Sequence, residues 1–148
     1  MKFSPPSLTV GLDVAAEADA VWDLLVQVDQ WPRWGPTVRR ARVHGVDVGS
    51  ERGGRIGPDA TGTVWTSVGP AVTFRIDAWQ DTGRVRHWSW RVAGVHATGH
   101  TVRAHEGGCR VEMTAPWWAP AYAPVLWLAL RRIRDLAQAR PAAGDTTG

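Results

Sequence analysis

A rigid aromatic segment, Trp31-Pro32-Arg33-Trp34-Gly35-Pro36, constrains the fold of this chain more than any other feature. Each indole is a large apolar group with one N–H donor, so the segment favours a half-buried position. The two prolines fix φ and prevent a long helix from running through. We therefore predict a helix, then a short stiff elbow, then a strand. An elbow of this kind is suited to close the mouth of a cavity.

The composition is that of a globular protein with an unusual number of tryptophans. Of 148 residues, 44% are hydrophobic, 21% are charged and 10 are tryptophan. A chain of this length is expected to form one domain and to bury roughly 70% of its unfolded surface, enough for a core and a pocket. Ten tryptophans exceed what such a core requires. We predict a single domain over residues 1–140 and a disordered C-terminal tail over residues 141–148.

Charge and hydropathy exclude several classes of protein. The net charge is +3, but the arginines are scattered through most segments, which argues against nucleic-acid binding. The first ten residues contain Pro5-Pro6 and lack the apolar stretch of a signal peptide. The longest apolar run, Ala119–Leu130, is shorter than the roughly 20 residues that a membrane span needs. The single cysteine, Cys109, forms no internal disulfide. We expect a cytoplasmic protein with no integral membrane segment.

Hydrophobic periodicity indicates the order of the elements. Residues 7–14 alternate between apolar and other side chains, as in a strand with one buried face, and from Glu17 the apolar residues recur at helical spacing for about three turns. Residues 45–62 are rich in glycine and charge and read as turn and loop. Short runs separated by turns predict strands over 38–46, 63–68, 72–79, 84–92, 95–105 and 109–115. A final helix is predicted over residues 121–139, with one apolar stripe formed by Tyr122, Leu126, Ala129, Ile133 and Leu136.

This order predicts an α+β fold, a curved antiparallel sheet of about seven strands wrapped on a long C-terminal helix. The helix must bury its apolar stripe, and the face of the sheet is the largest apolar surface available. Sheets of this size twist and curl. A curled sheet around one helix leaves a cleft lined from both sides, where pockets of such domains commonly lie.

Three segments resemble a known family. They are Val21-Trp22-Asp23-Leu24-Leu25, the aromatic elbow, and the stretch from Trp90 to Val102; Gly107-Gly108-Cys109-Arg110-Val111 fits the same pattern. Together they are similar to the START-like (SRPBCC) superfamily, and among its members to the bacterial polyketide cyclase/dehydrase type, over roughly residues 7–138. The resemblance implies the helix-grip fold. It implies little about function, because the superfamily includes lipid carriers, hormone receptors, aromatic cyclases and chaperone co-factors.

Aromatic residues on the predicted inner faces are the candidate ligand contacts. Trp88 and Trp90 share one parity of a strand, so they form either a flat pocket wall or plain core. Trp31 and Trp34 are candidates for the cavity mouth, with a purely structural elbow as the alternative. The full set of predicted ligand-binding residues is Trp65, Phe74, Trp88, Trp90, His100, Tyr122 and Leu126.

Two polar residues are the candidates for orienting a ligand or moving a proton. If Val102 faces inward, alternation places His96, Thr98 and His100 on the same side of their strand, although His96 lies near a turn and is expected to be partly exposed. Imidazole serves as a hydrogen-bonding group or as a general acid or base. His100 and Tyr122 are therefore the catalytic candidates if the protein is an enzyme, and structural packing is the alternative for both.

The sequence contains no pattern for other chemistry. The five histidines show neither HxH nor HExxH spacing, and no GxSxG, Walker or Rossmann motif is present, so we predict no metal and no cofactor. The favoured interpretation is binding of a small hydrophobic, aromatic or lipid-like molecule in a Trp-lined cavity. The alternatives are a polyketide cyclase or dehydratase that uses the same cavity, and a protein-interaction module. The oligomeric state is left open.

Overall fold

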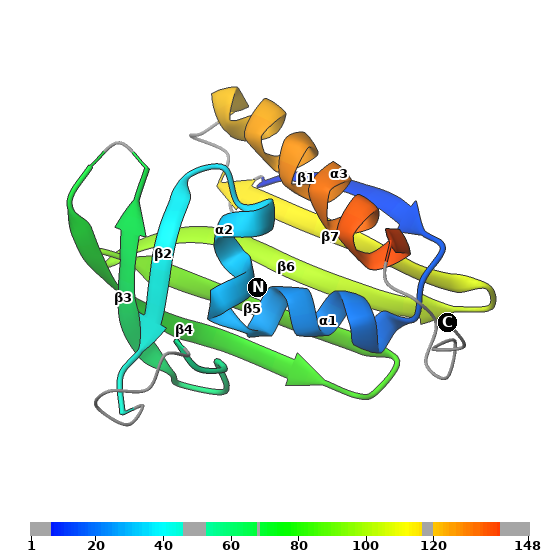
Figure 1. The fold of residues 1–148 in the computed structure, drawn as a ribbon, viewed down its shortest axis with the longest axis horizontal. Coiled ribbons are helices and arrows are strands. Elements are labelled where there is room, and N and C mark those ends of the chain that lie inside the picture. The colour runs from blue at the N-terminus through cyan, green and yellow to red at the C-terminus, as the bar shows by residue number, and fades with distance from the viewer. Residues whose placement is uncertain (1–6, 46–52, 68, 117–119, 140–148) are drawn as a thin grey trace, which may run out of the picture.

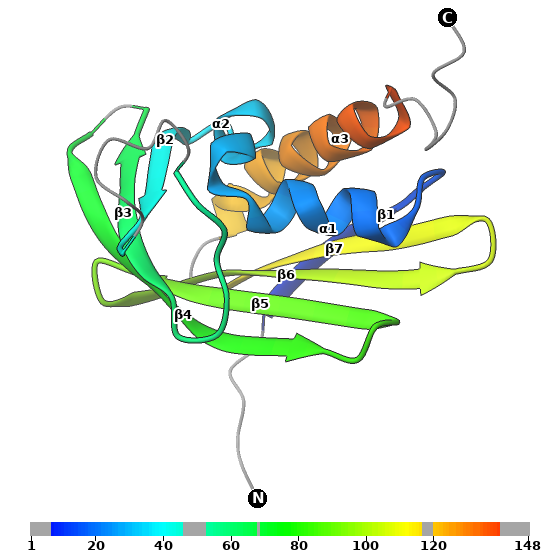
Figure 2. The same ribbon diagram turned by 60° about the horizontal axis from the view of Figure 1, so that its bottom comes forward.

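A seven-stranded antiparallel sheet forms one layer of the protein, and helices pack against its concave face (Figures 1 and 2). The computed structural model describes residues 7–45, 53–67, 69–116 and 120–139. The strands are β1 (Ser7–Val14), β2 (Val38–Val43), β3 (Thr61–Thr66), β4 (Ala71–Asp81), β5 (Val85–Val92), β6 (Val95–His105) and β7 (Gly108–Pro116). The helices are α1 (Ala18–Val26), η1 (Val28–Gln30), α2 (Trp31–Trp34), η2 (Pro120–Tyr122) and α3 (Ala123–Ala139).

The strand order is β1-β7-β6-β5-β4-β3-β2, so the first strand pairs with the last, and β1 and β2 form the two edges of the sheet. Consecutive strands from β2 to β7 are antiparallel neighbours. Short connections between alternating segments produce this arrangement. The predicted α+β helix-grip architecture is confirmed.

The long helix α3 lies across β1 and β7 and buries one apolar face (Figure 1). The buried residues on this face are Leu126, Ala129, Leu130, Ile133 and Ala137. Tyr122 and Leu136, at the two ends of the predicted stripe, are half-buried. The apolar core therefore lies between α3, α1 and the inward-facing side chains of the sheet.

The aromatic elbow is a single helical turn, which the periodicity did not indicate. Helix α1 ends at Val26, and α2 follows with Pro32 in its first turn, where a missing N–H removes no helical hydrogen bond. Both indole N–H groups reach back to the carbonyl oxygens left free at the end of α1. Trp31 Nε1 donates to Leu25 O at 2.8 Å, and Trp34 Nε1 donates to Leu24 O at 2.7 Å. These bonds hold the elbow against the end of the helix.

Strand β3 begins at Thr61, earlier than the predicted boundary at residue 63, and ends at Thr66. Gly62 had the appearance of a turn residue, but it pairs with Phe74 on β4. A side chain at Gly62 would collide with the Phe74 ring, so the glycine is required by close packing inside a strand. The tail predicted over residues 141–148 lies outside the described residues.

Candidate functional site

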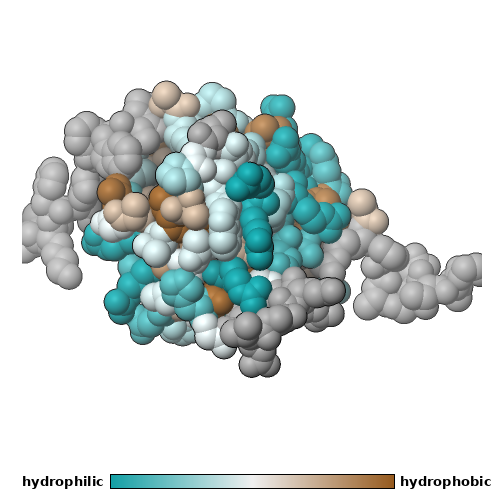
Figure 3. All heavy atoms as spheres, turned by 60° about the vertical axis from the view of Figure 1, so that its left-hand side comes forward, coloured by the Kyte–Doolittle hydropathy of each residue, from teal (hydrophilic) through white to brown (hydrophobic). Residues whose placement is uncertain are grey.

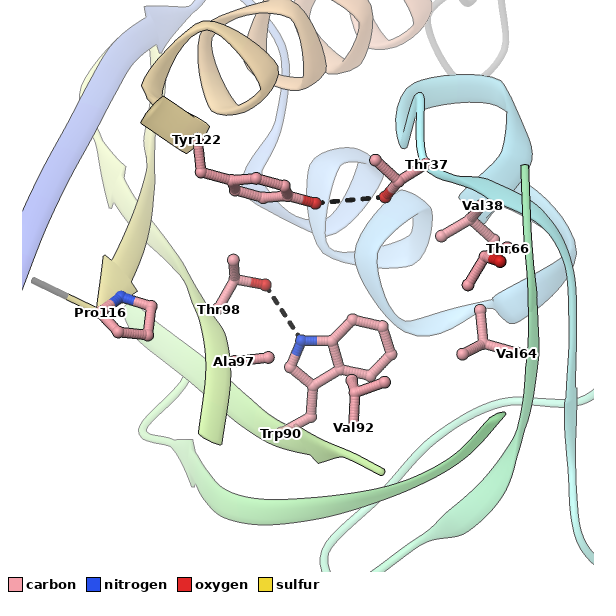
Figure 4. Close-up of a pocket in the computed structure, with 10 residues that line it drawn as sticks. All are labelled: Thr37, Val38, Val64, Thr66, Trp90, Val92, Ala97, Thr98, Pro116 and Tyr122. Carbon is pink, nitrogen blue, oxygen red and sulfur yellow. Dashed lines mark hydrogen bonds between the residues drawn. The ribbon is translucent and has the colours of Figure 1, made fainter. Parts of the chain in front are cut away.

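A cavity of about 360 Å³ opens at one end of the sheet (Figure 4). Five segments build it: the start of β2, the end of β3, the β5–β6 hairpin, the end of β7 and η2 before α3. Its lining residues are Thr37, Val38, Val64, Thr66, Trp90, Val92, Ala97, Thr98, Pro116 and Tyr122. None of these lining residues carries a charge.

A smaller pouch of about 40 Å³ adjoins the cavity and extends toward the core. It shares five lining residues with the cavity: Thr37, Val38, Trp90, Thr98 and Tyr122. Beyond these it is lined by residues of the elbow, the sheet and α3, which include Trp31, Trp34, Trp88, His100, Met113, Leu126 and Ala129. A space of this size holds one water molecule or one small polar group, and no ring.

Four aromatic rings lie in contact beneath the cavity. The Trp88 and Trp90 rings are 5.7 Å apart between centroids and nearly perpendicular. Trp31 stacks on Trp88 at 5.6 Å and meets Trp90 edge-on at 5.3 Å, while Phe74 lies 5.6 Å from Trp90. Trp88 is completely buried, whereas Trp90 is half-buried and lines the cavity. The two indoles that share parity therefore occupy different depths.

His100 lies in the pouch and is only 3% exposed. Its ring stacks on Trp88 with 3.9 Å between centroids, and its Nε2 is 3.2 Å from Thr98 Oγ1. Burial lowers the pKa of His100 to about 3, and the backbone of Trp88 opposes this shift without cancelling it. The imidazole is therefore neutral at physiological pH.

Tyr122 and Thr37 face one another across the cavity, joined by a hydrogen bond of 3.2 Å between their hydroxyl groups (Figure 4). Tyr122 comes from η2, at the start of the long helix, and Thr37 comes from the segment that follows the elbow. The bond links the two elements that close over the sheet at this end. Both residues line the cavity and the pouch, and Thr37 is exposed.

The remaining predicted site residues on the inner side of the sheet lie around or behind the pouch. Leu126 lines the pouch from α3. Phe74 is buried behind Trp90 and is not among the lining residues of the cavity or pouch. Trp31 and Trp34, predicted at the mouth, are 1% and 7% exposed and line the pouch from its inner side.

Trp65 lies on the opposite face of the sheet from the cavity. Its neighbours Val64 and Thr66 line the cavity, so alternation turns Trp65 outward, where the Arg40 guanidinium lies 4.8 Å from its ring centroid. His96 is exposed and lies 3.3 Å from Asp77, because the pairing of β5 with β6 shifts between Ser89 and Arg91. We therefore leave Trp65 and His96 out of the candidate site.

Several cavity residues were not predicted. Thr98 was placed on the inner face by its parity with His100, but nothing in the sequence indicated that its hydroxyl joins two ring nitrogens. Thr37, Val64 and Val92 resemble ordinary strand or loop residues in sequence. They become wall residues because separate segments converge at one end of the sheet.

Neither a metal cluster nor a membrane-spanning helix is found where the chain is described. Over residues 7–45, 53–67, 69–116 and 120–139, no group of three or more His, Cys, Asp or Glu side chains is arranged to hold a metal ion. Within these same ranges, none of the helices is long and apolar enough to cross a membrane.

Comparison with solved structures shows the same fold at low sequence identity. The hypothetical protein jhp0584 from Helicobacter pylori matches with a TM-score of 0.66 and 10% identity, over 88% of this chain and 86% of that chain. Protein CV1439 from Chromobacterium violaceum matches with a TM-score of 0.61 and 13% identity, over 92% and 100%. The di-domain ARO/CYC StfQ from the steffimycin biosynthetic pathway matches with a TM-score of 0.62 and 15% identity, over 88% of this chain and 44% of that chain.

Comparison with curated proteins yields no significant match. A family model described as polyketide cyclase / dehydrase and lipid transport matches residues 5–139, which is nearly the whole chain.

Proposed function

This chain belongs to the polyketide cyclase / dehydrase and lipid transport family, and from that premise we propose that it binds a small hydrophobic molecule in the cavity beside Trp90. The observation that carries the proposal is an uncharged cavity of about 360 Å³ with an indole in its wall. Pockets for small ligands combine apolar walls with a few polar groups, and this cavity has that character. Its polar groups are the hydroxyls of Thr37, Thr66, Thr98 and Tyr122.

Apolar burial would supply most of the affinity. A ligand with two fused aromatic rings that buries roughly 250 Å² gains about 6 kcal/mol before the costs of association and ordering. In this proposal Trp90 forms the wall that the ligand contacts, Tyr122 closes the opposite side, and the pouch residues His100, Trp88 and Leu126 lie at the inner end. Phe74 supports Trp90 from behind.

Fluorescence titration tests the proposal. A naphthalene-type dye that enters the cavity should quench tryptophan emission saturably. Trp90→Ala should weaken its binding by roughly 1–3 kcal/mol, because the variant removes a wall of the cavity. Trp127→Ala is the matched control, since Trp127 is 40% exposed on α3 and lines neither space. Equal weakening by the two substitutions, or no saturable quenching, would contradict the proposal.

Cyclase or dehydratase activity is the second candidate, favoured by the family description. A general base works best when its pKa lies near the operating pH, whereas the pKa of His100 is lowered to about 3. Among the described residues, Tyr122 is the one other titratable group that lines the cavity or pouch. This set favours a binding protein. Turnover of a polyketide-like substrate that falls on the order of 10²–10⁴-fold in His100→Gln would instead favour the enzyme.

Surface hydrophobicity gives less support to a protein-interaction module. Large exposed hydrophobic side chains within the described ranges are Val95, Trp127 and Leu128. On the face shown in Figure 3, apolar atoms form small groups separated by polar ones. Scattered exposure of this kind is ordinary for a protein surface and does not mark an interface.

A further inference from the structure

We propose that the ligand is an uncharged molecule with a hydroxyl group, an alcohol or a phenol, whose hydroxyl enters the pouch and hydrogen-bonds with Thr98. This inference rests on the proposed function, because it concerns what the same cavity selects. It follows from three features of the site: the missing charge, the hydrogen-bonding capacity of Thr98, and the size of the pouch.

The wall of the cavity and pouch selects against charge. Among the described residues, the lining of both spaces contains no Asp, Glu, Lys or Arg, and burial lowers the pKa of His100. Moving a carboxylate, phosphate or ammonium into such a site costs several kcal/mol unless a paired charge is supplied. A neutral ligand avoids this cost.

Thr98 Oγ1 is the centre of a short chain of hydrogen bonds. Trp90 Nε1 donates to it at 3.0 Å, as Figure 4 shows, and His100 Nε2 lies 3.2 Å away. A threonine hydroxyl donates one hydrogen bond and accepts two. The indole is a donor only, so it uses one acceptor position. The bond with His100 uses one further position, and one hydrogen-bonding position of Thr98 remains for a group in the cavity.

The tautomer of His100 decides which position remains. If Nε2 is unprotonated, Thr98 donates to it and keeps one acceptor position for a ligand O–H. If Nε2 carries the proton, Thr98 accepts from it and keeps its own O–H for a ligand oxygen. A ligand hydroxyl donates and accepts, so it completes the bonding of Thr98 in both cases. An ether or ketone oxygen completes it in one case.

One other buried polar atom favours the same group. Trp88 Nε1 belongs to a pouch residue and is without a hydrogen-bond partner in the described part of the chain. Unpaired buried polar atoms carry a desolvation cost. The pouch of about 40 Å³ admits a hydroxyl but not a ring, so the ring system would occupy the cavity and the hydroxyl the pouch.

Isothermal titration calorimetry with three matched probes tests the inference: 2-naphthol, 2-methoxynaphthalene and 2-naphthoate at pH 7. The probes share the ring system and differ in the polar group. We expect 2-naphthol to bind about 3–10-fold more tightly than the methyl ether, the range that one net hydrogen bond gives. We expect 2-naphthoate to bind more weakly than both.

The variant Thr98→Val keeps the shape of the side chain and removes the hydroxyl. It should bring the affinities for 2-naphthol and 2-methoxynaphthalene to within about twofold of each other. Thr98→Ser, which retains a hydroxyl, should keep the preference. Thr101→Val is the matched control, because Thr101 lies on the same strand but bonds to His87 on the outer face of the sheet. If Thr98→Val does not fold, the wild type and Thr98→Ser still provide the comparison.

The possible outcomes separate the two proposals. Equal binding of 2-naphthol and 2-methoxynaphthalene by the wild type would overturn the hydroxyl preference and leave the binding function intact. Tightest binding of 2-naphthoate would overturn the selection against charge. If none of the three probes binds, the proposed binding function itself fails. A naphthol preference that survives in Thr98→Val would remove Thr98 from the hydroxyl site.

Discussion

Two threonine–histidine pairs lie on opposite faces of the sheet, one within β6 and the other between β6 and β5, and their environments differ. On the inner face, Thr98 and His100 are 3.2 Å apart. On the outer face, Thr101 Oγ1 and His87 Nδ1 are 2.8 Å apart. The residue types are identical and the bonds are of similar length. The inner pair lies within one strand and uses Nε2, the outer pair joins two strands through Nδ1, and the surroundings of the two pairs differ most.

Burial dominates on the inner face. His100 is enclosed by indoles, and desolvation lowers its pKa to about 3. His87 is partly buried, and burial also lowers its pKa, followed by the charge of Arg103, while Asp77 acts in the opposite direction. The outer histidine lies among charges that partly compensate one another, and the inner histidine has no such neighbour among the residues lining the pouch.

The outer face is a network of polar contacts. Arg103 pairs with Glu112 at 2.8 Å, and Ser89 donates to Asp77 at 2.8 Å. The ion pair of Arg103 is largely exposed at the arginine, and pairs of this kind contribute little to stability and depend on salt. The sheet therefore separates two tasks: the inner face provides the core and the cavity, and the outer face carries a network of polar and charged contacts.

The largest effect should come from placing a charge in the core between the sheet and α3. Ile133 is completely buried on α3, so Ile133→Asp would bury an unpaired carboxylate and should cost more than about 5 kcal/mol, enough to unfold the domain. Circular dichroism and urea denaturation measure the loss. Arg131→Asp, on the exposed side of the same helix, should leave the protein folded. A folded Ile133→Asp protein with an unchanged melting temperature would refute this packing.

A loss of stability of intermediate size should follow from removing the Trp88 ring from the aromatic stack. Trp88 is completely buried between Trp31 and His100, so Trp88→Ala should cost about 3–5 kcal/mol in the free energy of unfolding. On the outer face, Arg103→Ala removes one exposed ion pair and should cost at most about 1 kcal/mol. Urea denaturation of both variants measures the contrast. Similar losses would break the distinction between the two faces.

The pH dependence of stability tests the two histidines directly. Because the folded pKa of His100 lies below its ordinary value of 6.5, the unfolded chain binds more protons between these values, and stability falls as pH falls from about 6.5 toward 3. Between pH 7 and pH 4 this amounts to roughly 3 kcal/mol.

His100→Gln should therefore lose less stability than the wild type as the pH is lowered over this range. His87→Gln is the control on the outer face: its effect should have the same sign, because its pKa is also lowered, and be smaller. Denaturation curves at several pH values measure both slopes. Identical slopes for the wild type and His100→Gln would show that His100 titrates normally in the folded protein.

The fold was predictable because its signals are local. Strand alternation over residues 7–14 and the apolar stripe of the last helix each depend on neighbouring residues, and both appear in the structure. The helix-grip resemblance added the topology. The main local error was at Gly62, which packs under Phe74 inside a strand; contact with a residue distant in sequence requires a glycine there.

The site was less predictable, because its geometry depends on register. Trp65 was a reasonable aromatic candidate, but its parity relative to Val64 turns it to the outer face. The shift in pairing between Ser89 and Arg91 leaves His96 exposed although it shares parity with His100. A shift of one residue in the strand pairing reverses the face of each side chain beyond it. The sequence pattern does not indicate where such shifts occur.

The sequence by itself determined the kinds of elements, their order and the residues able to form a buried aromatic layer, because these depend on periodicity along the chain. Only the tertiary structure decided that Trp31 and Trp34 bond to the end of α1 and that Thr98 joins Trp90 to His100. The physical reason is that hydrogen bonds and cavities require atoms from separate segments to meet within a few ångströms. That meeting depends on strand register and helix placement, which the whole fold sets.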